Sequence, residues 1–129
     1  MRTRQCDKTI RQGRMSKAEQ FADAASLVRD LADGHEDVAD ACVTLCVHAG
    51  IAASDVICCA KLGEHAQGES HETAVALLAK ADGDASKWLR ALLGLKTKAG
   101  YSHQPATTED FKRAGRAAEA LVEKARRVT

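Results

Sequence analysis

A long apolar run from Val38 to Leu62 stands out in an otherwise mixed sequence. Its apolar residues are mostly small, and His48 and Asp55 interrupt it, which argues against a span of the lipid bilayer. We therefore predict that the run forms the buried central helix of a soluble protein. A chain of 129 residues is long enough to build one domain around such a helix.

The composition indicates that the rest of the core is helical as well. Hydrophobic residues make up 45% of the chain but aromatic residues only 3%, so alanine, leucine, valine and cysteine must fill the core. Sandwiches and barrels need many turn residues, whereas this chain has nine glycines and a single proline, Pro105. These features predict an all-α fold.

Capping residues and apolar periodicity predict the first three helices. Ser16 and Glu19 form a capping box for a helix over about 17–32. The central helix is expected to follow and to end at about His65. Ser70 is placed to cap a third, shorter helix.

Two further helices are predicted in the C-terminal part. The fourth carries an apolar stripe that begins at Trp88, and Gly100 is well suited to stop it. Thr107 or Thr108 caps the fifth, whose apolar stripe begins at Phe111. Because short connections make neighbouring helices antiparallel, we expect an up-and-down four-helix bundle with an additional short helix.

The first residues carry much of the positive charge. The formal net charge of the chain is +1, but the residues before Met15 carry +4, which leaves −3 for the rest. Because this stretch has almost no apolar residues, we expect residues 1–15 to be a basic disordered extension and residues 16–129 to be the folded domain. A mildly acidic domain is not typical of proteins that bind duplex DNA by broad phosphate neutralisation.

The five cysteines are predicted to be reduced thiols of a cytoplasmic protein, because their number is odd and they lie in helical patterns. No metal site is expected, since Cys42 and Cys46 point away from His48 on a helix. The sequence contains no phosphate-binding glycine loop, so no cofactor is expected. The N-terminus lacks the apolar region of a signal peptide.

The predicted central helix has a polar seam opposite its small apolar face. At 100° per residue, four side chains fall within about 40° of one another. They are Asp37, Thr44, His48 and Asp55. The seam predicts either a groove or dimer surface, or polar groups that are satisfied by neighbouring helices.

The segment "LKTKAGYSHQ" (95–104) contains the main candidate site. Its polar side chains are Lys96, Lys98, Tyr101, Ser102 and His103. Both lysines lie in the last turn of the predicted fourth helix, where cations stabilise the negative end of the helix dipole. The same side chains could instead form a phosphate-binding cluster, and from the residues alone both interpretations stay open.

Two stretches resemble a known family. "GESHETAVALLAK" and "LRALLGLKTKAGYSHQPATTEDFKRAGRAAEALVEKA" are similar to the second half of HEPN domains, an all-helical family named for nucleotide binding in higher eukaryotes and prokaryotes. The likeness lies in a Ser-His pair that opens a short helix, a basic helix end with an Ala-x-Tyr motif, and an alanine-rich last helix.

The resemblance implies two possible functions. Ribonuclease members of the family cleave RNA without a metal, by an arginine that holds the phosphate and a histidine that follows it with four to six residues between them. Here Lys96 or Lys98 takes the place of the arginine and His103 that of the histidine, and lysine lacks the bidentate fork. The altered motif favours a non-catalytic HEPN-like homodimer that binds a partner protein, a nucleotide or RNA, with Tyr101, Ser102, His48 and Asp55 as binding residues.

The alternative is a metal-independent endoribonuclease that uses Lys96 or Lys98 with His103 as acid and base. The family resemblance further implies a bacterial protein of a toxin–antitoxin or defence system, with an antitoxin or a nucleotidyltransferase as a possible partner.

Overall fold

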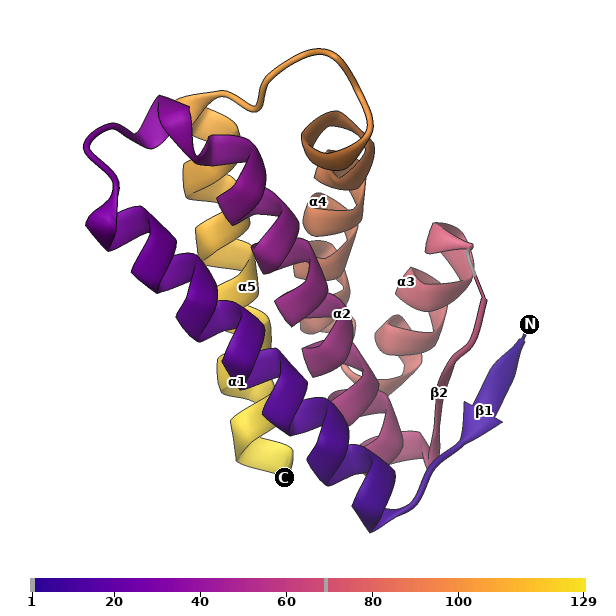
Figure 1. Cartoon of the computed structure of the whole chain (residues 1–129). Coiled ribbons are helices and arrows are strands. Elements are labelled where there is room, and N and C mark those ends of the chain that lie inside the picture. Colours follow the sequence, from indigo (N-terminus) through magenta and orange to yellow (C-terminus); the bar gives the residue numbers. More distant parts are fainter. Residues whose placement is uncertain (1, 69) are drawn as a thin grey trace.

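The computed structural model describes residues 2–68 and 70–129 and consists mainly of helices (Figure 1). The α-helices of this described part are α1 (Lys8–Leu31), α2 (Ala39–Leu62), α3 (His71–Ala81), α4 (Gly83–Gly100) and α5 (Thr108–Val128). A short 3-10 helix, η1 (His35–Asp37), and two strands, β1 (Thr3–Gln5) and β2 (Glu64–Ala66), complete it. The predicted all-α class is confirmed, with one two-stranded sheet that the sequence did not predict.

The apolar run forms α2, which contacts α1, α3, α4 and α5 and lies at the centre of the helices (Figure 1). It is the one helix of the described residues that is long and apolar enough to cross a membrane, and 72% of its most apolar window is buried inside the protein. The predicted central helix is thus confirmed. It ends at Leu62 rather than His65, because Gly63 adopts the left-handed conformation and directs the chain into β2.

Small residues allow α2 to approach its neighbours closely. Ala49, Ala52 and Ala53 are fully buried. A side chain at Gly50 would collide with Leu92 of α4, and would also come within 3.3 Å of Leu121 of α5. Since protein interiors are close-packed, this position has no room for even a methyl group.

The disordered extension predicted for residues 1–15 is not what the structure shows. β1 pairs antiparallel with β2, with Thr3 opposite Ala66. Asp7 then caps α1 by accepting a hydrogen bond from the backbone N–H of Ile10 at 2.9 Å. The first helix therefore begins nine residues before the predicted position, and Met15 lies buried within it.

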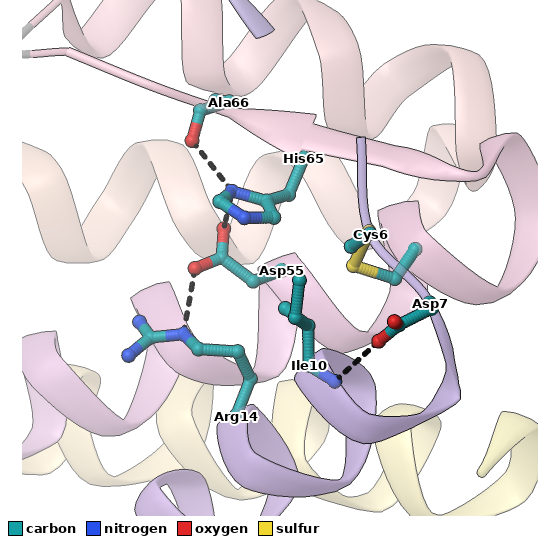
Figure 2. Close-up of a disulfide and its surroundings, with 8 residues drawn as sticks. Cys6, Asp7, Ile10, Arg14, Asp55, His65 and Ala66 are labelled. Atoms are coloured by element: carbon teal, nitrogen blue, oxygen red, sulfur yellow. Dashed lines mark hydrogen bonds and ion pairs between the residues drawn. A yellow bond between two sulfur atoms is a disulfide. The ribbon is translucent and has the colours of Figure 1, made fainter. Parts of the chain in front are cut away.

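The prediction that all cysteines are reduced is also wrong, because Cys6 and Cys59 form a disulfide (Figure 2). It links the residue after β1 to the last turn of α2. The free cysteines are Cys42, Cys46 and Cys58, and all three are buried. Burial raises the pKa of the Cys46 thiol to about 11 and that of Cys58 to about 12, so both stay protonated at neutral pH.

The later helix boundaries follow the predicted caps more closely. Ser70 caps α3 by accepting from the N–H of Thr73. Thr107 and Asp110 form a capping box at the start of α5. Asp82 caps α4, which starts at Gly83 and therefore earlier than the apolar stripe suggested. α4 does end at Gly100, but that glycine has no positive φ, and Tyr101 is the C-terminal cap.

Candidate functional site

Lys98 makes an ion pair within the fold. Its Nζ donates to Oδ2 of Asp110 at 2.8 Å, and the same oxygen accepts from the backbone N–H of Thr107. The hydrogen bond from Lys98 is the main reason why the pKa of the Asp110 carboxyl is lowered. This lysine therefore connects the end of α4 to the start of α5, and its charge is already balanced.

His103 and Ser102 lie in the turn that follows α4, and both are exposed. The hydroxyl of Ser102 accepts from the N–H of Gln104 at 3.1 Å, and the N–H of Ser102 donates to the carbonyl of Thr97. These contacts stabilise the turn. In the described residues, no hydrogen bond or ion pair joins His103 to Lys96 or Lys98, so the proposed acid–base pair is not assembled within one chain.

Lys96 has a different environment from Lys98, because it lies at a small cavity between α2 and α4. We call this the Tyr101 cavity; its volume is about 150 Å³. Its lining residues are Thr44, Val47, His48, Lys96, Gly100 and Tyr101. The structure thus brings together three predicted site residues and Thr44 of the polar seam.

Aromatic rings border the Tyr101 cavity. His48 is exposed and packs against Phe21 of α1, with ring centroids 5.4 Å apart and planes tilted by 33°. Tyr101 is 78% exposed, which is unusual for a side chain of its size. A cation, an imidazole and an exposed phenol ring therefore lie at one place on the surface.

Asp55, the last residue of the seam, lies apart from the Tyr101 cavity. Its Oδ2 accepts a hydrogen bond from Nε of Arg14 at 2.9 Å, and its Oδ1 is 3.8 Å from Nδ1 of His65 (Figure 2). Nδ1 of His65 also lies 2.8 Å from the carbonyl of Ala66. Burial raises the pKa of the Asp55 carboxyl, and the charges of Arg14 and His65 oppose this effect. Asp55 mainly connects α1, α2 and β2.

A second small cavity lies between α2, α3 and α4, with a volume of about 160 Å³. We call it the His71 cavity. Its polar lining residues are Ser54, Asp55, Ser70, His71 and Lys96. Its apolar wall includes Ile51, Leu89 and Leu93. Lys96 therefore lines both cavities, although nothing in the sequence pattern distinguishes it in this way from Lys98.

Sequence reasoning missed several partners of the predicted residues. Arg14 was assigned to a disordered extension, and His65 to the end of a helix. Asp40 was not considered, yet its Oδ1 accepts from the N–H of Ala106 at 2.8 Å and holds the loop after α4. Phe21, which packs against His48, was not considered either. These contacts join residues that are far apart in the sequence, and no local signal indicates them.

A larger cavity, about 320 Å³, lies elsewhere, between α1, α2 and α5. Its floor includes the protonated thiols of Cys42 and Cys46. Its rim carries Asp23 and Glu119 together with Arg29 and Arg126, so it offers no net charge to select a ligand. None of the predicted site residues lines it, and we therefore place the candidate site around Lys96.

No protein-family model and no curated protein sequence matches this chain. Among residues 2–68 and 70–129, no group of three or more His, Cys, Asp or Glu side chains could hold a metal ion. The chemistry available at the candidate site is therefore that of a lysine, imidazole rings, hydroxyl groups and a phenol ring.

The ion pair of Lys98 should make stability depend on pH in acid. Because the folded-state pKa of Asp110 is lowered, its contribution is present above the unfolded value of about 3.9 and is lost as the pH falls through the lower folded value. Lys98→Met should thus cost a few tenths to about 1 kcal/mol at pH 5.5 and less at pH 3.

Urea denaturation at both pH values measures this difference. Lys96→Met is the matched control, since Lys96 forms no ion pair with any described residue, and its effect should be the same at both pH values. A cost for Lys98→Met that does not shrink in acid would contradict the ion pair.

Proposed function

We propose that this protein is a non-catalytic, HEPN-like four-helix bundle with one additional short helix, and that it binds single-stranded RNA or a nucleotide at the Tyr101 cavity. The proposal rests on the different environments of Lys96 and Lys98. Lys98 is neutralised by Asp110, whereas Lys96 lies beside His48 and the exposed ring of Tyr101. One available cation next to an exposed ring suits a phosphate with a neighbouring base.

The environment of His103 supports binding rather than cleavage. General acid–base catalysis of phosphodiester cleavage needs the histidine and a phosphate ligand to act on the same phosphate. The lysine at the family's shortest spacing from His103 is already paired with Asp110, and His103 itself lies in an exposed turn. A single chain thus offers a binding surface without an assembled nuclease pair.

We further propose that the protein is a homodimer and acts in a toxin–antitoxin or defence system, as the resemblance implies. Leu27 and Leu31 support an interface, because they lie one turn apart on α1 and are 60% and 81% exposed. Two large apolar side chains that face solvent side by side are typical of contact surfaces.

RNA binding tests the proposal directly. Fluorescence anisotropy of a labelled single-stranded RNA in EDTA should show binding that weakens about 5- to 150-fold in Tyr101→Ala, since base stacking contributes about 1–3 kcal/mol. Lys96→Ala should weaken binding and lower the slope of log K against log salt by somewhat under one. Lys98→Ala and His103→Ala are the controls, and both should bind like the wild type.

The same samples, run on a denaturing gel, report cleavage. Cleavage of the RNA by the wild type but not by His103→Ala would overturn the non-catalytic proposal and support the metal-independent endoribonuclease. Absence of binding by the wild type would remove RNA from the proposal.

A further inference from the structure

Lys96 lies between two cavities and lines both of them. The Tyr101 cavity and the His71 cavity both include it, and they follow one another along α2, from Thr44 and His48 to Ser54 and Asp55. Small-molecule sites usually have volumes of about 300 Å³ or more, which neither cavity reaches alone and the two reach together. A ligand that occupies both cavities at once would contact Lys96 between them.

The two cavities offer different contacts. The Tyr101 cavity is lined by two ring side chains, His48 and the largely exposed Tyr101. The His71 cavity has an apolar wall with Leu89 and Leu93, and Ser54 and Ser70 also line it. A flat ring with polar edges fits such a site, because the ring face contacts the apolar wall while the edge reaches hydrogen-bonding groups.

The charges also suit a negative group at the centre. Asp55 lines the His71 cavity, but its carboxylate is bonded to Arg14 and lies near His65, so its charge is balanced. Among the described residues that line the two cavities, Lys96 therefore carries the positive charge that no ion pair balances. A phosphate with a ring system on each side matches this arrangement, because the phosphate would lie at Lys96 and one ring system in each cavity.

We propose that the ligand unit is a dinucleotide. Lys96 binds its linking phosphate, one nucleoside lies against Tyr101, and the other occupies the His71 cavity. This inference rests on the proposed function, because it assumes a nucleotide ligand at Lys96. It adds that a single nucleotide fills only half of the site.

Calorimetric titration with two probes tests the inference on the full chain. The dinucleoside monophosphate ApA should bind about 10-fold more tightly than AMP, even though AMP carries more negative charge. His71→Ala, at an exposed position, should weaken ApA about 3- to 10-fold and leave AMP unchanged. Ala74→Leu, which fills the cavity from α3, should bring ApA to the affinity of AMP. Ala76→Leu, exposed on the same helix, should leave both unchanged.

The outcomes separate the two proposals. Equal affinities for ApA and AMP in the wild type, both lost in Lys96→Ala, would overturn the dinucleotide site and leave the proposed function standing. Tighter binding of ApA that neither His71→Ala nor Ala74→Leu reduces would also overturn it. Failure of both probes to bind the wild type would overturn the dinucleotide site, and failure of the labelled single-stranded RNA as well would remove the proposed function itself.

Discussion

Replacement of Gly50 with valine is expected to lower the free energy of unfolding by about 3 kcal/mol, because an extra side chain in a close-packed core forces its neighbours out of place. Gly50 lies on α2 where it faces both α4 and α5. The added Cβ would collide with Leu92 and approach Leu121 at 3.3 Å. Both leucines are fully buried, so they can make room only by displacing other core side chains.

Urea denaturation followed by helical circular dichroism measures this loss. Gly94→Ala on α4 is the matched control, since an added Cβ there meets no atom within 4 Å. In an exposed helix interior this change should stabilise the protein by about 0.5–1 kcal/mol. An unchanged midpoint for Gly50→Val would show that α2 does not approach α4 and α5 at this residue.

Removal of the disulfide should cost about 2–4 kcal/mol. The bond between Cys6 and Cys59 closes a loop with a sequence separation of 53 residues, and a cross-link over a loop of this length restricts the unfolded chain strongly. Cys6→Ser, at a half-buried position, should therefore shift the urea midpoint downwards. Dithiothreitol should produce the same shift in the wild type and none in Cys6→Ser.

Cys42→Ala serves as the control for this experiment, because Cys42 is a free thiol and the variant should keep its sensitivity to reductant. Alkylation of the denatured, non-reduced protein should modify three of the five cysteines. Modification of all five would contradict the disulfide.

The sequence predicted the C-terminal helices better than the N-terminal segment, for a physical reason. Thr107 and Asp110 cap α5 through contacts three residues apart, and a pattern of that length can be read locally. The segment before Met15 owes its order to distant residues instead. Cys6 forms a disulfide with Cys59, and Arg14 forms an ion pair with Asp55. These contacts with α2 order a charged stretch that has few apolar residues of its own.

The candidate site was predicted only in part, because local patterns can be read from the sequence but contacts between distant residues cannot. The helical wheel placed Thr44 and His48 on one face, and both line the Tyr101 cavity. The spacing to His103 could not distinguish Lys96 from Lys98, because only the tertiary fold brings Asp110 next to Lys98. The sequence thus indicated the side chains of the site, but not that the fold pairs Lys98 with Asp110 and places Lys96 at the cavity.

The position of α2 in the chain also affects how the protein folds during synthesis. The most apolar helix leaves the ribosome well before α4 and α5, which cover two of its sides. Until those later helices emerge, α1 is the long helix of the described residues that can shield it, and exposed apolar surface makes a nascent chain prone to aggregation. Translation of the last helix therefore completes the core, and a nascent chain that stalls before Thr108 exposes the face of α2 that α5 should bury.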